Sequence, residues 1–239
     1  MKMGMGMIVP EINNLPGQRS TGGGGGGLQS IANNFSMQFN GIDEYFDAGL
    51  ISQLDGSAGS DCSISFWMKR GISTSTSEQR IISTRGTSIR DHGIEFRIRP
   101  SDGRLVYTFG FDQGGSSTGG GYTSGTVSLS LNNDWHHIAF VADATAGTTT
   151  SYLDGQPVQT SNRVGYSMSG ALYNFVIGAK SSDKSGNYFG YVDEVGVFDY
   201  KLEASDIEDI YDITNSDPTQ AADLSTLSTP PIAWYRMGD

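Results

Sequence analysis

Residues 135–141 read Trp-His-His-Ile-Ala-Phe-Val, and residues 151–155 read Ser-Tyr-Leu-Asp-Gly. Successive side chains of a β-strand point to opposite faces of a sheet. The odd-numbered residues from Trp135 to Val141 would therefore share one face, with Ile138 and Phe140 on the other. Asp-Gly is a dipeptide that favours tight turns between antiparallel strands. The two segments predict a β-hairpin that turns back at Asp154-Gly155.

The strand pattern continues on both sides of this hairpin. We expect further strands at 35–39, 63–69, 79–84, 93–99, 104–111, 126–131, 175–179 and 188–198. Many short strands at hairpin spacing, without helices between them, predict an all-β fold, a two-sheet antiparallel jelly-roll sandwich. The 33 glycines fit this fold because glycine adopts positive φ in turns at low steric cost. One short C-terminal helix is expected at Ala204–Tyr211.

Three regions are expected along the chain. Residues 1–34 contain six consecutive glycines and predict a flexible N-terminal arm, and residues 35–211 form the sandwich. Residues 212–239 form a linker and a terminal strand. The apolar segment 232–237 either pairs back onto the sandwich or begins a further domain.

Composition excludes several classes of function. The net charge is −11 and no Lys/Arg cluster occurs, which argues against nucleic-acid binding. No apolar run approaches the roughly 20 residues that a membrane-spanning helix needs. Cys62 is the only cysteine, so no disulfide can form within the chain. The N-terminus lacks the apolar core of a signal peptide, which indicates assembly in the cytoplasm.

Three ordered segments resemble laminin-G-like jelly-roll domains of the concanavalin A-like lectin/glucanase superfamily. The first is Phe39–Gly49 followed by 64–69, the second is the 135–155 hairpin, and the third is Phe189–Phe198 with the helix after it. Residues 35–45 after a glycine-rich leader, and residues 231–239, resemble laminin-G-like proteins of marine bacteriophages. This resemblance implies a virion protein.

The resemblance implies one structural Ca²⁺ site and no required cofactor. Members of the superfamily hold Ca²⁺ with an aspartate of a late strand and carbonyls of an early loop, here Asp193 with Asn40 and Gly41. Such oxygen ligands suit Ca²⁺. Alternatively, Asp193 only accepts hydrogen bonds from the loop backbone. His136 and His137 are adjacent on a strand and cannot chelate one ion together, so His137 is interpreted as a packing residue.

Catalysis is not expected. Glucanases of this superfamily use two carboxylates on one strand face, and retaining chemistry needs them about 5–5.5 Å apart. Glu95 stands alone in its strand, and Asp193 and Glu194 are adjacent and face opposite ways. Glycan contacts are expected instead from loops at the sheet edges, which mix polar side chains with a few aromatic ones. The predicted ligand residues are Arg85, Arg90, Asp91, His92, Tyr122 and Tyr188.

Two functions remain open. The first is a non-enzymatic virion structural protein, a capsid decoration, fibre or tail-appendage subunit. Its N-terminal arm would dock onto other virion proteins, and it would form a homo-oligomer. The alternative is a carbohydrate-binding adhesion module for host-cell or environmental glycans, with an extracellular or cell-surface location.

Overall fold

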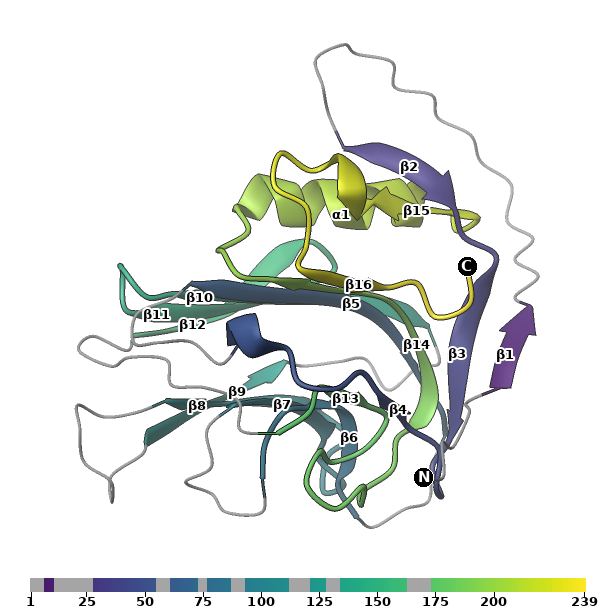
Figure 1. Cartoon of the computed structure of the whole chain (residues 1–239), viewed down its shortest axis with the longest axis vertical. Helices are drawn as coiled ribbons and strands as arrows, with labels where there is room; N and C mark the ends of the chain where they lie inside the picture. The colour runs from purple at the N-terminus through teal and green to yellow at the C-terminus, as the bar shows by residue number, and fades with distance from the viewer. Residues whose placement is uncertain are drawn as a thin grey trace.

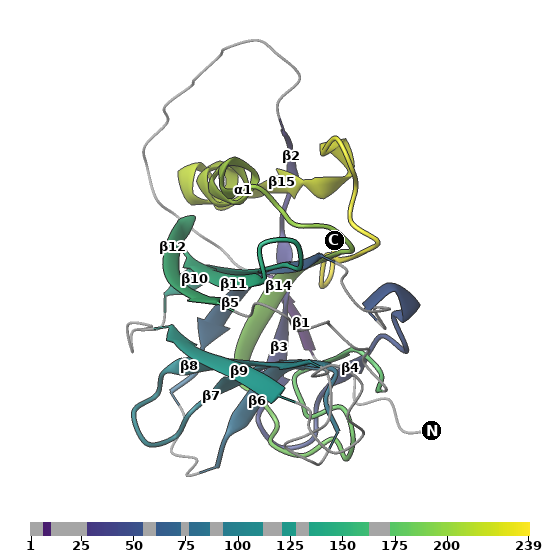
Figure 2. The same cartoon turned by 90° about the vertical axis from the view of Figure 1, so that its left-hand side faces the viewer.

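The structure is a computed structural model that describes residues 7–10, 28–54, 61–72, 77–86, 93–111, 121–127, 134–162 and 173–239. Two antiparallel sheets are stacked face to face, and a helix with a small two-stranded sheet forms a third layer (Figure 1; Figure 2). The predicted all-β sandwich with a helix near the C-terminus is therefore confirmed.

The larger sheet has eight strands in the order β1-β3-β14-β5-β10-β11-β12, and β16 also pairs with β14. These strands are β1 (Met7–Pro10), β3 (Phe35–Asn40), β5 (Cys62–Arg70), β10 (Trp135–Asp143), β11 (Thr148–Leu153), β12 (Gln156–Asn162), β14 (Phe189–Phe198) and β16 (Ala233–Tyr235). The predicted hairpin is formed by β10 and β11, with Ile138 opposite Leu153. β14 pairs with β3 through residues 189–192 and with β16 through residues 195–197.

The second sheet has six strands in the order β4-β13-β6-β7-β8-β9. They are β4 (Phe46–Asp47), β6 (Gln79–Ser83), β7 (Gly93–Ile98), β8 (Leu105–Phe111), β9 (Gly121–Val127) and β13 (Val176–Ile177). β9 begins earlier than the strand expected at 126–131, and residues 128–133 lie outside the described residues. Its backbone pairs with β8 along its whole length.

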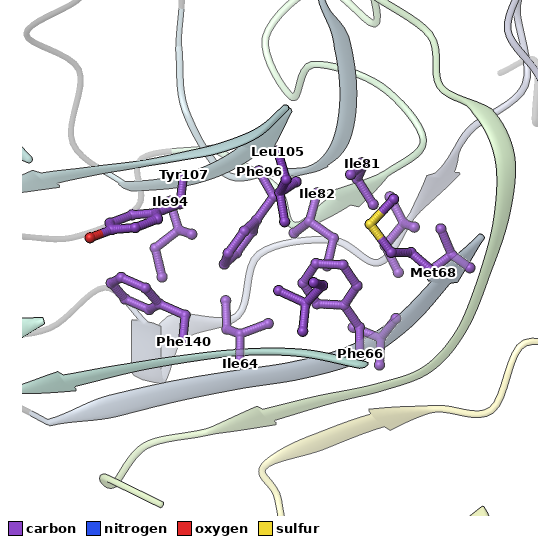
Figure 3. Packing of buried hydrophobic residues seen from close by; sticks show 14 of the residues in the cluster. Ile64, Phe66, Met68, Ile81, Ile82, Ile94, Phe96, Leu105, Tyr107 and Phe140 are labelled. Carbon is purple, nitrogen blue, oxygen red and sulfur yellow. The ribbon is translucent and has the colours of Figure 1, made fainter. Parts of the chain in front are cut away.

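The main core lies between the two sheets (Figure 3). Ile64, Phe66 and Phe140 of the larger sheet face residues of the smaller one, among them Phe96 and Tyr107. The ring centroids of Phe66 and Phe96 are 5.2 Å apart, in an edge-to-face arrangement. Such aromatic pairs add to the free energy gained by burying the rings.

A second core lies between the larger sheet and the helix α1 (Ala204–Ser216). Ile207 and Ile210 of α1 are buried there with Ala139 of β10. The two-stranded sheet of β2 (Gln29–Ala32) and β15 (Gln220–Asp223) lies beside α1 (Figure 1). The short 3-10 helices η1 (Ser52–Leu54) and η2 (Leu224–Thr226) complete the described elements.

Both ends of the chain differ from the sequence expectation. Residues 212–231 were expected to be a linker, but they contain the end of α1, β15 and η2. The N-terminal region 1–34 contributes β1 and β2 to two different sheets. Of the two alternatives for the terminal segment, pairing back onto the sandwich is the one observed, because β16 pairs with β14. Partners distant in sequence determine the structure of these segments.

Candidate functional site

A group of charged side chains lies on the outer face of the six-stranded sheet. Along β7, Ile94, Phe96 and Ile98 belong to the main core, so Glu95 and Arg97 point the other way. Arg80 of β6 lies opposite Arg97, and Thr108 of β8 lies opposite Glu95. The neighbouring strands thus bring residues that are distant in sequence onto one surface.

Two arginines and two glutamates form a closed ring there, which we call the Arg–Glu ring: Glu78, Arg80, Glu95 and Arg97. Glu78 accepts hydrogen bonds from Nη2 of Arg80 at 2.9 Å and from Nε of Arg97 at 3.0 Å. Oε1 of Glu95 lies 3.2 Å from Nη1 of Arg97, and Oε2 lies 3.6 Å from Nε of Arg80. That Nε is buried and has no hydrogen-bond partner. Charge-assisted bonds of this kind fix planar donor and acceptor groups in space.

A loop from residue 178 to residue 188 borders this face. The carbonyl oxygen of Gly186 accepts a hydrogen bond of 2.7 Å from the backbone N–H of Arg80. Nζ of Lys184 lies 2.9 Å from Oδ2 of Asp47 and 5.5 Å from the ring centroid of Tyr45. This loop, which ends at the predicted ligand residue Tyr188, therefore lies beside the Arg–Glu ring.

Of the predicted ligand residues, the structure describes the side chains of Arg85 and Tyr188. Arg85 is buried directly after β6. Arg90, Asp91 and His92 lie outside the described residues, and for Tyr122 in β9 only the backbone is described. Tyr188 requires a correction, because its side chain is 0% exposed and its hydroxyl donates to the carbonyl oxygen of Lys69 at 3.0 Å. Burial raises the pKa of Tyr188, as expected for a core tyrosine.

The predicted Ca²⁺ ligand set does not form. Asn40 pairs with Phe189, whereas Asp193 lies four residues further along β14, a separation of about 13 Å. The two carboxylate oxygens of Asp193 instead accept hydrogen bonds from the backbone N–H of Glu194 and from Nδ2 of Asn33. No group of three or more His, Cys, Asp or Glu in the described part of the chain could hold a metal ion. Asp193 therefore has a hydrogen-bonding role, but its described donors are Glu194 and Asn33 rather than the backbone of the loop at Asn40 and Gly41.

Asp193 lies in a buried acidic cluster at the bulge of β14. Burial and the neighbouring Glu194 raise the pKa of Asp193, and burial raises the pKa of Glu194. Nε of Arg236 lies 3.1 Å from Oε1 of Glu194. This positive charge acts against the rise in the pKa of Glu194. Oδ1 of Asn33 is a buried acceptor without a hydrogen-bond partner. A protonated Asp193 carboxyl could donate to that oxygen after rotation of the Asn33 amide.

His137 is a packing residue, as the sequence indicated. Its ring centroid lies 5.3 Å from that of Trp67, and its Nε2 lies 2.8 Å from Oγ of Ser65. Burial lowers the pKa of His137 to about 4. Nδ1 has no hydrogen-bond partner, and the nearby Asp154 binds Nδ1 of His136 instead. The Ser65–His137 pair therefore lacks the orienting carboxylate and the access that a catalytic triad needs.

A family model described as the concanavalin A-like lectin/glucanases superfamily matches residues 40–208. This match covers most of the chain, including β4 to β14 and the first part of α1. The chain belongs to this superfamily. A search of curated proteins finds no match.

Solved structures show the same superfamily fold at low sequence identity. A protein from Bacteroides ovatus, named as a candidate carbohydrate-binding protein, has a TM-score of 0.57 at 15% identity, over 87% of this chain and 51% of its own. The binding domain of botulinum neurotoxin serotype G has a TM-score of 0.55 at 17% identity, over 79% of this chain and 45% of its own. The binding domain of Paraclostridial Mosquitocidal Protein 1 has a TM-score of 0.55 at 17% identity, over 78% and 45%. The chain thus spans about half the length of these structures.

The Arg–Glu ring was not recognised in the sequence. Glu95 is the only carboxylate within β7, and its acidic neighbour Glu78 belongs to a different part of the chain. Glu78 reaches the same surface from the residue before β6, 17 positions earlier in the chain. The alternation of Glu95 and Arg97 with the apolar residues of β7 was the available signal.

Proposed function

We propose that this chain is a non-enzymatic, lectin-like module that binds carbohydrate on the outer face of the six-stranded sheet. The observation that carries this proposal is the Arg–Glu ring, because its charged groups are gathered on one sheet face. In the described part of the chain the one α-helix, α1, lies beyond the opposite sheet (Figure 1). The family and the fold neighbours with binding functions support the same conclusion.

Guanidinium and carboxylate groups suit the recognition of sugars. Each presents two parallel donors or acceptors, which match the spacing of neighbouring hydroxyl groups. In this ring the side chains are already fixed by their partners, so binding costs little conformational entropy. Glu78 is the most exposed member, and Lys184 in the bordering loop adds another donor.

The same ring argues against hydrolysis. A glycosidase needs one carboxylic acid as proton donor and a second carboxylate as base or nucleophile. Both glutamates are instead engaged with Arg80 and Arg97. We infer binding without bond cleavage.

The test is a glycan-array experiment on the full chain and on the variants Arg97→Gln and Glu78→Gln. Each variant removes one charge from the ring, and we expect loss of the glycan signals that the unaltered chain gives. Lys201→Gln is the control, because Lys201 pairs with Asp143 at the edge of the other sheet. Circular dichroism must show that each variant is folded.

Two results would overturn this proposal. One is an array on which the unaltered chain binds no glycan. The other is retention of all signals in folded Arg97→Gln and Glu78→Gln proteins. Release of reducing sugar from a bound glycan would contradict the non-enzymatic part alone.

A virion structural role is our second proposal. Its specific support is the pairing of β1, in the N-terminal region, with β3 at the edge of the larger sheet. The same edge could accept that strand from a neighbouring subunit, which would link copies in a particle. Deletion of residues 1–27 should then abolish incorporation into particles and lower the oligomeric state. Unchanged incorporation of the deletion variant would exclude this role for the region.

A further inference from the structure

A second cluster lies on the outer face of the larger sheet. Trp135 of β10 and Tyr191 of β14 both lie opposite Lys69 of β5 in the strand register. Their side chains share the face that carries Trp67 and His137, one row closer to the end of the sheet. Tyr211 of α1 stacks on Trp67 and so covers the neighbouring row. Trp135, Lys69 and Tyr191 remain partly exposed.

Lys69 is positioned between the two rings. Its Nζ lies 6.0 Å from the ring centroid of Trp135 and 5.7 Å from that of Tyr191. The two centroids are 6.2 Å apart, and their planes meet at 58°. The electron-rich faces of aromatic rings attract an ammonium group, so Nζ of Lys69 lies at about the same distance from both rings.

Phe189 extends the cluster toward the end of the sheet. Its ring lies against Gly71, where a Cβ would come within 2.6 Å of Cε1 of Phe189. Ile42 and Ile72 follow in the adjoining loops, and each is 77% exposed. Phe189 thus lies between the backbones of Gly41 and Gly71, each one residue before an exposed isoleucine. We call Lys69, Trp135, Phe189 and Tyr191 the aromatic–lysine patch.

The composition of the patch indicates its ligand. Aromatic faces pack against the C–H groups of a sugar ring, and rigid rings lose little entropy on binding. Nζ of Lys69 carries donors and a positive charge on a protein whose net charge is −11. Anionic bilayers are bound by clusters of several Lys and Arg residues, and the sequence contains no such cluster, whereas a single Nζ can pair with one acidic group of a sugar. Gln38, on the same face opposite Tyr191, adds an amide for hydroxyl groups.

We propose that the aromatic–lysine patch is a separate binding site for acidic sugars, which carry a carboxylate or a sulfate ester. The sugar ring stacks on Trp135 or Tyr191, and its acidic group contacts Nζ of Lys69. This site does not depend on the Arg–Glu ring, because the two lie on opposite sheets. Trp135 is half-buried beside Lys69, so part of its ring is accessible to a ligand.

Binding of the full chain to three polymers tests this proposal: polygalacturonate, dextran sulfate and neutral dextran. We expect binding to at least one acidic polymer, weakening with added salt, and much weaker binding to neutral dextran. Lys69→Gln and Trp135→Ala should each lower the affinity about tenfold or more. Lys69→Arg should retain binding, because it preserves the charge. Whether polygalacturonate or dextran sulfate binds distinguishes a carboxylate from a sulfate site.

The controls separate this site from the first one. Arg97→Gln should leave binding to acidic polymers unchanged, and Lys201→Gln should do the same. Equal binding of neutral dextran would overturn the proposal, as would full binding by a folded Lys69→Gln protein. Binding to vesicles of anionic phospholipid but to neither acidic polymer would also overturn it. If Arg97→Gln gave the same glycan-array signals as the unaltered chain, that result would contradict the Arg–Glu ring as a binding site and would not bear on the aromatic–lysine patch.

Discussion

Nε1 of Trp234 donates a hydrogen bond of 2.6 Å to Oε2 of Glu194, and this bond ties β16 to the bulge of β14. Glu194 is buried and has a positive φ of 49°. Further along the same segment, Oδ2 of Asp239 accepts a hydrogen bond of 2.8 Å from the backbone N–H of Asn34. The C-terminal segment therefore contacts both the strained Glu194 and the backbone of Asn34, next to the first residue of β3.

Trp234→Phe should destabilise the protein by about 1–3 kcal/mol, because a buried carboxylate oxygen loses its donor. Urea denaturation, followed by fluorescence or circular dichroism, measures this change. Tyr191→Phe is the control, since it removes one hydroxyl from a partly exposed ring and should change stability by less than about 0.5 kcal/mol. Equal stabilities of Trp234→Phe and the unaltered chain would show that the bond contributes nothing.

His137 should make stability depend on pH below neutrality. Its pKa is about 4 in the folded protein and near 6.5 when unfolded, because burial disfavours the charged ring. The contribution of the neutral ring is fully present above pH 6.5 and is lost as the pH falls toward 4, with a total on the order of 3 kcal/mol. The free energy of unfolding, measured by denaturation at several pH values in this range, should change less with pH for His137→Gln than for the unaltered chain. An identical pH dependence of stability in His137→Gln and the unaltered chain would contradict this role of the buried ring.

Asp193 should make the protein less stable as the pH rises, which is opposite to the effect of His137. Its folded-state pKa is raised by burial and by Glu194, so its contribution is fully present at low pH and declines as the pH rises. Asp193→Asn keeps the shape without the charge, and we expect it to be more stable than the unaltered chain in mildly alkaline buffer. At acidic pH the two proteins should be similarly stable. A large loss of stability in Asp193→Asn at alkaline pH would instead indicate a required charge at this position.

Gly49 and Gly178 both have positive φ, and together they separate two costs of an alanine substitution, backbone strain and steric clash. A Cβ at Gly178 would lie 2.5 Å from Cε1 of the buried Phe39, whereas none of the described atoms lies within 4 Å of a Cβ at Gly49. Gly49→Ala should therefore cost about 1–2 kcal/mol from φ alone. Gly178→Ala should cost more, because the core must also move. Thermal unfolding of both variants checks the order, and the reverse order would contradict the packing described around Phe39.

Some features of this protein follow from local sequence. The alternation at 135–141 and the Asp154-Gly155 turn predict β10, β11 and their hairpin, because side-chain alternation and turn preference depend on neighbouring residues. The same rule places Glu95 and Arg97 on the face opposite Phe96. The superfamily and the sandwich could be recognised from such segments.

Other features were decided by contacts between distant residues. The pairing of β15 with β2 joins Ala222 to Ser30, and no local pattern in the polar segment 212–231 indicates it. The register of β3 on β14 separates Asn40 from Asp193, and the convergence of β6 and β7 brings Glu78 to Arg97. Periodicity fixes the face on which a side chain lies, but only the packed sheets fix which strands meet and in what register. The fold was therefore accessible from the sequence, whereas both proposed binding surfaces required the tertiary structure.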